Sequence, residues 1–216
     1  MKISILCTSI EHPVFERLVA WKNKHNLNYD IELVHSTQDL TGGDILFLIS
    51  CNELIKKDVL NQYKSILVIH ASDLPEGKGW SPHIWQIIEG KNNIIVTLLE
   101  AEDKVDSGLI WTQRKLILYG HELYDEINEK LFAIEIDLMD FAVENFKNIS
   151  PMPQREVDAT FYRKRTSEDS RIVPEKSIAE QFDLLRVADT HRFPAFFDFR
   201  GYRYQIELKK LSYSHD

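Results

Sequence analysis

A histidine and an aspartate beside two predicted strands are the residues of this sequence best suited to acid–base chemistry. His70 ends the apolar run 65–69, and Asp106 lies in the loop after the next apolar run, 92–100. An imidazole beside a carboxylate can hold or transfer a proton, while the carboxylate selects the ring tautomer and stabilises the charged form. Taken alone, a histidine at a strand end is more often structural, and an aspartate before Ser-Gly is usually a turn residue. From these two residues alone, both interpretations stay open.

The elements that must position this pair alternate between apolar runs and amphipathic segments. The runs have the length of buried strands, and the amphipathic segments carry apolar residues at helical spacing. This alternation predicts an α/β fold with a doubly wound, mostly parallel, Rossmann-like sheet, in which ligands bind beyond the carboxyl ends of the strands. The predicted strands are 2–8, 29–35, 44–50, 65–69, 92–100 and 108–118, and the predicted helices are 12–25 and 120–146. The first strand-to-helix turn contains no glycine, which argues against NAD or FAD there.

Composition and charge exclude several classes of function. The chain has 216 residues and a formal net charge of −8, without the long basic block that nucleic-acid binding usually needs. Its apolar runs are too short for a membrane span, and its first residues do not have the layout of a signal peptide, so we expect a cytoplasmic protein that binds no membrane. The only cysteines are Cys7 and Cys51, and the histidines lack metal-ligand spacing. We therefore expect neither a disulfide framework nor a metal site.

The composition of the sequence changes after Asn148, where the helical apolar pattern gives way to a polar segment that contains Pro151 and Pro153. This change predicts a catalytic domain of residues 1–148 and a C-terminal appendage of residues 149–216. Within the appendage, 177–189 indicates a short helix, and the aromatic stretch around Gly201 indicates a β-hairpin.

The predicted hairpin carries aromatic residues on both faces. Alternation puts Phe197, Phe199 and Arg203 on one face, with Phe196, Tyr202 and Tyr204 on the other. A two-stranded hairpin is marginal alone in water, so each face needs a partner surface. We expect one face to pack on its own chain and the other on a second copy, which favours a homodimer; coverage of both faces within one chain is the alternative.

Two stretches of the sequence resemble the N10-formyltetrahydrofolate-dependent formyltransferases. They are IHASDLPEGKGWSP (69–82) and VTLLEAEDKVDSGLI (96–110). The residues that match the family pattern are His70, Ser72, Leu74, Pro75, Gly79, Pro82, Val96, Thr97, Asp106 and Gly108. The resemblance implies that His70 stabilises an oxyanion on the formyl group and that Asp106 orients His70. It also implies N10-formyltetrahydrofolate as formyl donor and tetrahydrofolate as product.

Val68 departs from the family pattern, which usually has an asparagine at this position to help hold the oxyanion. A valine side chain cannot donate a hydrogen bond. Loss of one such donor typically lowers the rate of acyl transfer about 10²- to 10³-fold, so another group must replace it in an active enzyme. Protonated His70, a backbone N–H or Asn52 are the alternatives.

The second half of the chain resembles the sugar-nucleotide N-formyltransferases within this family. FYRKRTSEDSRI (161–172) and FDLLRVADTHRFPAFFDFRGYRYQI (182–206) carry that likeness. Planar guanidinium groups can bind a diphosphate, and aromatic faces can stack on a base or a sugar ring. The alternative is that the arginines of 161–172 are solvent-exposed charges without a binding role. The resemblance implies a cofactor site at Leu99, Glu102, Asp103, Val105 and Asp106, with the pterin near 99–105. It implies a substrate site at Ser72, Lys78, Gly79, Trp80, Tyr162, Arg163, Arg165 and Arg186.

The expected function is therefore transfer of a formyl group to the amine of an amino-deoxysugar linked to UDP or dTDP. The small enzymes that act on UDP-4-amino-4,6-dideoxy-N-acetyl-hexosamines of the pseudaminic acid type resemble the chain most. Two alternatives stay open, a glycinamide ribonucleotide formyltransferase and a catalytically inactive module that binds folate or a nucleotide. Methionyl-tRNA formyltransferases share the N-terminal half, but we expect no tRNA substrate because the chain is acidic and ends soon after the hairpin.

Overall fold

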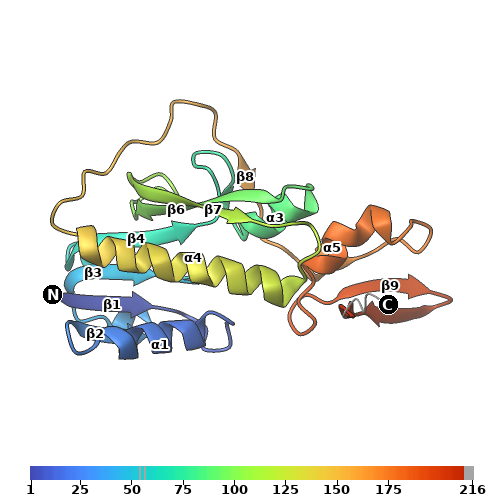
Figure 1. Cartoon of the computed structure of the whole chain (residues 1–216), viewed down its shortest axis with the longest axis horizontal. Helices are drawn as coiled ribbons and strands as arrows, with labels where there is room; N and C mark the ends of the chain where they lie inside the picture. The colour runs from blue at the N-terminus through green and yellow to red at the C-terminus, as the bar shows by residue number, and fades with distance from the viewer. Residues whose placement is uncertain (54, 56, 212–216) are drawn as a thin grey trace, which may run out of the picture.

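A six-stranded sheet forms the centre of the molecule (Figure 1). The computed structural model describes residues 1–53, 55 and 57–211, with the backbone alone at positions 57 and 60; the last five residues of the predicted appendage lie outside the described part. The strand order is β2-β1-β3-β4-β6-β7. The bounds are β1 Lys2–Leu6, β2 Asp30–Val34, β3 Gly43–Leu48, β4 Tyr63–His70, β6 Asn93–Glu100 and β7 Ile110–Ile117. Each overlaps a strand predicted from the apolar runs.

The sheet is parallel in its first half and antiparallel in its second. β1 pairs in parallel with β2 and β3, and β3 pairs in parallel with β4. β6 runs antiparallel to β4, and β7 antiparallel to β6. The predicted α/β fold with a mostly parallel sheet is thus confirmed, but the direction of β6 changes how the loop after it reaches the site.

Two helices cover one face of the sheet. α1 (Phe15–His25) buries Leu18 and Trp21, and α4 (Tyr124–Asn145) buries Ile127, Leu131 and Leu138 at the helical spacing that the sequence predicts. Figure 1 shows α4 crossing in front of the strands and α1 below it, and both helices share one apolar core with the sheet. Burial of this face is what holds the strand ends in place.

The opposite face of β4 is less covered and turns toward the site. Ile66 and Val68 join a smaller apolar cluster there with residues of β3 and of the short helix α2 (Lys57–Leu60). Because side chains alternate along a strand, His70 lies on this same face, and Leu67 and Ile69 pack against the main core.

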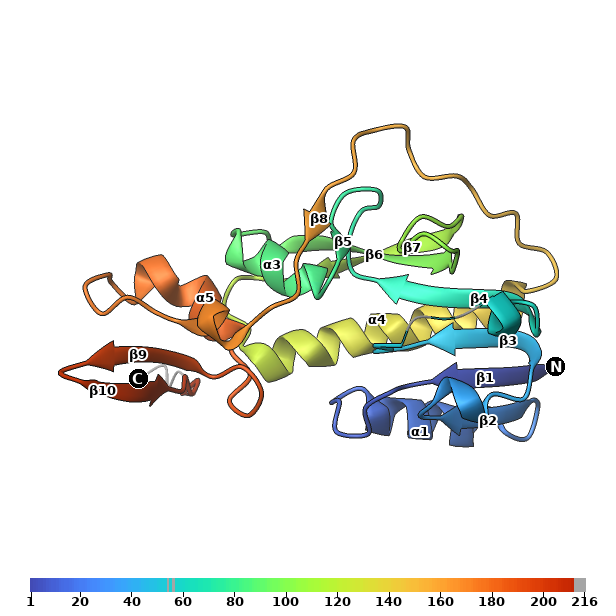
Figure 2. The same ribbon diagram turned by 180° about the vertical axis from the view of Figure 1, so that it is seen from behind.

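The first part of the predicted appendage, which follows α4, passes back over the sheet (Figure 2). There β8 (Phe161–Tyr162) pairs in parallel with β5 (Lys78–Gly79), a short strand in the loop before α3 (Pro82–Ile88). The chain then forms α5 (Phe182–Arg186) and 3₁₀ turns at Ser167–Ser170 and Ala179–Gln181; a further one, Thr37–Asp39, precedes β3. The parallel pairing with β8 was absent from the sequence prediction.

The C-terminal hairpin turns where it is predicted, but its faces differ from the prediction. β9 (Ala195–Phe199) and β10 (Tyr202–Ile206) flank Arg200 and Gly201, which both have positive φ, as a tight two-residue turn requires. Phe199 lies opposite Tyr202, and Phe197 opposite Tyr204.

Opposite residues share a face, so these four aromatic residues lie together and Phe196 lies with Arg203 on the other face. The predicted distribution was wrong because the turn register sets the pairing and one residue of shift exchanges the faces. No helix in the described part of the chain is both long and apolar enough to cross a bilayer.

Candidate active site

His70 is the last residue of β4 and is buried, with 6% of its surface exposed. Its Nε2 lies 2.9 Å from the carbonyl oxygen of Gly77, in the loop that follows β4. The main-chain N–H of Ser72 donates to the carbonyl of His70, which tightens the turn out of the strand. The ring is therefore fixed between its strand and the next loop.

Asp106 reaches His70 by a loop that folds back along the sheet. Since β6 is antiparallel to β4, it ends at Glu100 opposite Leu67, away from His70. Asp106 therefore does not reach His70 from the carboxyl end of a strand parallel to β4. The loop 101–109 instead closes on itself, with the N–H of Glu100 donating to the carbonyl of Leu109, and carries Asp106 back.

The geometry of this loop requires a glycine at position 108. A Cβ there would lie 1.9 Å from the carbonyl oxygen of Glu100, closer than any real contact. Asp106 itself has φ +53°, a left-handed conformation that aspartate tolerates better than most side chains. Glycine at 108 permits the close approach that returns the carboxylate to the histidine.

The two side chains meet on the free edge of β5. Nδ1 of His70 lies 3.5 Å from Oδ1 of Asp106, and the N–H of Gly79 donates to Oδ2 of Asp106 at 2.8 Å. Both ring nitrogens of His70 thus face an acceptor, the carboxylate and the Gly77 carbonyl. A neutral imidazole has one N–H and satisfies one acceptor, whereas the doubly protonated ring satisfies both.

Three residues that the sequence analysis did not single out support the pair. The side-chain amide of Gln154 donates to the carbonyls of Asp106 and Gly108, at 2.9 and 3.1 Å. Thr160 accepts the N–H of Gly77 on its hydroxyl, and Gln113 donates to Thr97 beside His70. Two of these residues, Gln154 and Thr160, belong to the polar segment after Asn148, where nothing distinguishes them from ordinary polar loop residues.

Neither Val68 nor Asn52 makes a hydrogen bond to His70 or Asp106 among the described residues. Val68 lies on the His70 face of β4 and packs in the apolar cluster. Asn52 is exposed, and its main-chain N–H donates to the hydroxyl of Thr8. The Nε2 of His70 is occupied by the Gly77 carbonyl.

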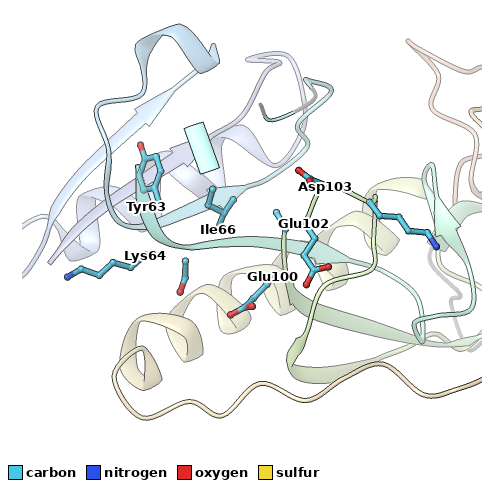
Figure 3. Close-up of a pocket in the computed structure, with 9 residues that line it drawn as sticks. Tyr63, Lys64, Ile66, Glu100, Glu102 and Asp103 are labelled. Carbon is cyan, nitrogen blue, oxygen red and sulfur yellow. The ribbon is translucent and has the colours of Figure 1, made fainter. Parts of the chain in front are cut away.

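A cavity of about 540 Å³ adjoins the loop that carries Asp106 (Figure 3). Its wall consists of the first half of β4 and the loop after β6: Tyr63, Lys64, Ser65, Ile66, Glu100, Ala101, Glu102, Asp103 and Lys104. Glu102 and Asp103, two of the predicted cofactor residues, line it. Leu99 is buried in the sheet, and Val105 is exposed outside the lining.

The sequence of the chain matches a protein-family model described as formyl transferase over residues 7–142. The chain belongs to the formyl transferase family. A methionyl-tRNA formyltransferase from Finegoldia magna is 27% identical over 121 residues, which is 56% of this chain and 39% of that protein. The match therefore spans well under half of that relative.

Solved structures share the fold at lower sequence identity. A methionyl-tRNA formyltransferase from Clostridium thermocellum superposes with a TM-score of 0.83 at 22% identity, covering 98% of this chain and 94% of that one. The Rv3404c protein from Mycobacterium tuberculosis, described as a likely sugar N-formyltransferase, gives 0.75 at 17% identity over 99% of both chains. HypX from Aquifex aeolicus in complex with tetrahydrofolic acid gives 0.78 at 20% identity, covering 96% of this chain and 37% of that one.

Aromatic and basic side chains of this formyltransferase gather beside β5 and β8. Tyr162 stacks on Trp85 with ring centroids 6.3 Å apart, and the guanidinium of Arg163 lies 4.9 Å above the Trp85 ring. Arg163 also forms an ion pair with Asp169. Trp80, 41% exposed, carries the ammonium of Lys164 4.7 Å above its ring. Trp85, Tyr162 and Arg163 thus form one cluster, and Trp80 and Lys164 form a second pair at the ends of β5 and β8.

Two other predicted substrate residues are buried arginines of the appendage. Arg165 donates to the hydroxyl of Ser170, and its Nε has no hydrogen-bond partner among the described residues. Arg186 is fully buried, where it donates to Asp183 and to the side chain of Asn92 at the start of β6. Arg186 therefore ties α5 to the sheet, and a role in substrate binding stays a prediction.

Ser72 lines a second, smaller cavity of about 210 Å³ between the 72–77 loop, α3 and β8. Its hydroxyl oxygen is buried with no hydrogen-bond partner within the described part of the chain. Gly77 and Tyr162 line the same cavity. No group of three or more His, Cys, Asp or Glu side chains in the described residues is arranged to hold a metal ion.

Proposed function

We propose that this formyltransferase moves a formyl group from N10-formyltetrahydrofolate to the primary amine of an amino-deoxysugar linked to UDP or dTDP. The observation that carries the proposal is the buried His70–Asp106 pair. The loop 101–109 that carries Asp106 also lines a cavity, and the β5 strand that holds the pair is joined to β8 beside the cluster of Trp85, Tyr162 and Arg163. Within this class we favour UDP-linked 4-amino-4,6-dideoxy-N-acetyl-hexosamines.

The cavity beside loop 101–109 fits the donor co-substrate. A pterin presents an amino group and ring N–H groups, which are hydrogen-bond donors. The loop offers main-chain carbonyls and the carboxylates of Glu102 and Asp103, and the Ile66 side chain supplies an apolar wall. The tetrahydrofolate in the structure of HypX, which shares this fold, supports this choice of donor.

In the proposed reaction His70 and Asp106 assist transfer of the amine proton and stabilise the charge that develops on the formyl group. The amine nitrogen forms a bond to the formyl carbon, the bond from that carbon to N10 breaks, and the proton lost by the amine ends on N10. Asp106 orients His70 and supports its protonated form through Nδ1. Holding both reactants in one cleft contributes much of the acceleration.

The surface formed by Trp80, Trp85, Tyr162 and Arg163 is the proposed place of the nucleotide part of the substrate. Aromatic faces stack on a base, and guanidinium groups pair with a diphosphate through two parallel hydrogen bonds. The likely sugar N-formyltransferase among the structural neighbours, which covers the whole chain, supports this assignment.

A methionyl-tRNA formyltransferase is the second candidate, because the similar proteins include enzymes of that name. The net charge of −8 weighs against it, since tRNA binding depends on positive charge.

The test is incubation of the purified protein with N10-formyltetrahydrofolate and a panel of amines. The panel contains UDP- and dTDP-linked aminosugars, methionyl-tRNA and glycinamide ribonucleotide, and products are identified by the mass of one added formyl group. Formylation of an aminosugar alone supports the proposal. Formylation of methionyl-tRNA or glycinamide ribonucleotide in its place assigns the corresponding alternative, and absence of turnover with every amine leaves a binding module.

A further inference from the structure

Lys78 occupies an unusual position for a lysine, between the two loop residues that hold the catalytic pair. Only 4% of its surface is exposed. The carbonyl of Gly77 accepts from His70, and the N–H of Gly79 donates to Asp106. On the other edge, the N–H of Lys78 itself donates to the carbonyl of Thr160. The backbone at this position is thus held on both sides.

The ammonium group of Lys78 has no hydrogen bond or ion pair with any residue that the structure describes. The charges that act on it are those of Lys104 and Asp106, both in loop 101–109. Burial lowers the pKa of Lys78, Lys104 lowers it further, and Asp106 acts in the opposite direction. The side chain of Lys78 is largely buried, and burial of a cation that no fixed partner pairs costs free energy, so such a group is a candidate for a functional role.

The side chain at position 68 does not supply the donor that the chemistry of the site needs. Val68 cannot donate, and the Nε2 of His70 already faces the Gly77 carbonyl. When the amine attacks the formyl carbon, the carbonyl electron pair moves onto the formyl oxygen, which needs a donor until the bond to N10 breaks. The Lys78 ammonium, on which the charge of Asp106 acts, has three N–H groups for which no described residue is an acceptor.

We propose that Lys78 is a further catalytic residue, whose ammonium donates to the formyl oxygen in place of a side-chain amide at position 68. The proposal rests on the proposed formyl transfer. Lys78 keeps its protons throughout: it stabilises the negative charge on the oxygen, and the proton lost by the amine still ends on N10. This is a narrower role than general contact with the substrate.

The experiment is a double-substitution cycle of Lys78→Met and Val68→Asn, measured as kcat and KM with the amine that the native protein formylates. Lys78→Met is expected to lower kcat roughly 10²- to 10³-fold with a small change in KM. Adding Val68→Asn to that variant is expected to restore kcat at least tenfold, more than the same substitution changes the native protein. Lys78→Arg, which keeps a charged donor, is expected to retain more activity than Lys78→Met.

Lys115→Met, at an exposed lysine of β7, is the matched control and should leave kcat unchanged. Circular dichroism and melting temperature identify any variant that fails to fold, in which case Lys78→Arg and Lys78→Gln carry the test. A kcat of Lys78→Met within threefold of the native value overturns the proposal. The proposal is also overturned if the change in kcat of the double variant equals the product of the changes in the two single variants.

Hydrolysis of N10-formyltetrahydrofolate to tetrahydrofolate and formate is followed in parallel, because it needs no amine. If the native protein hydrolyses the donor but formylates no aminosugar, the proposed substrate is wrong. The role of Lys78 is then still decided by the same cycle on hydrolysis.

Discussion

At the scale of single residues, the contacts of His70 predict how the site responds to substitution. His70→Ala removes the group between Asp106 and Gly77, and Asp106→Asn removes the negative charge while the amide oxygen can still accept from Gly79. We expect each to lower kcat/KM for formyl transfer about a hundredfold or more, the usual contribution of a positioned acid or base. Steady-state kinetics on proteins of native circular dichroism check this, and near-native turnover in either variant contradicts the proposed roles.

A second prediction concerns Glu135 of α4, whose Oε2 is buried without a hydrogen-bond partner among the described residues. Burial raises its pKa to about 8 from an ordinary value of 4.5. Between these values the unfolded chain loses the proton while the folded chain keeps it, so folding stability falls as the pH rises.

We therefore expect Glu135→Gln to raise the melting temperature relative to the native protein, with a gain that grows up to pH 8 and vanishes below about pH 4.5. Glu144→Gln, at an exposed position of the same helix, is the control. The comparison is best made above pH 6.5, because burial also lowers the pKa of His12 and His83 below their ordinary 6.5. These two histidines destabilise the fold only on the acid side. A gain that is equal at pH 6.5 and pH 8 would contradict the assignment.

At the scale of elements, loop 101–109 determines whether Asp106 meets His70. Gly108→Ala forces a Cβ against the carbonyl of Glu100, so the loop must move. We expect a loss of at least tenfold in kcat/KM and weaker binding of a stable folate analogue, measured by titration.

Gly90→Ala tests whether the effect is specific to this loop. Its Cβ meets no atom within 4 Å, although its φ of +85° makes the substitution mildly destabilising. It should lower the melting temperature and leave formyl transfer intact. Equal kinetic effects of the two substitutions would show that the loop does not depend on the close approach at Gly108.

The elements also mark the limit of what the sequence could predict. Apolar runs and helical spacing place the strands and the long helix to within a few residues, because local burial decides them. The direction of β6 and the pairing of β5 with β8 depend on contacts between distant segments, which no local pattern encodes. The register of the hairpin depends instead on which two residues form its turn. His70 and Asp106 could be singled out because they follow predicted strands and match the family pattern. Gln154 and Thr160 could not, because only the fold brings their polar segment to the site.

At the scale of the whole molecule, the hairpin presents an aromatic face that its own chain leaves partly open. Phe199, Tyr202 and Tyr204 are 47%, 70% and 45% exposed, while Phe196 on the other face is covered by Arg171 and Arg203. Exposed aromatic clusters of this kind are typical of interfaces. We propose that this face forms a homodimer.

Sedimentation velocity on the intact protein is expected to show a dimer, and Tyr202→Glu is expected to give a monomer. Tyr119→Glu, at an aromatic residue 76% exposed outside the hairpin, should leave the dimer intact. A monomeric native protein at micromolar concentration excludes the proposed dimer. If the native protein is a dimer, formyl transfer by the monomeric Tyr202→Glu variant shows whether the second copy contributes to the site.

The pairing of β5 with β8 has a consequence for the order in which the protein folds. The partners Lys78 and Phe161 are far apart in the sequence, and contacts between distant segments close slowly because the intervening chain must first be ordered. The sheet and α4 can form before this contact, but the loop that holds His70 and Asp106 stays open on one edge until β8 docks. Pulse-labelled hydrogen exchange should therefore protect the amides of Gly77, Lys78 and Trp80 after those of β1, β3 and β4. The folding chain would therefore form its hydrophobic core first and complete its candidate active site last.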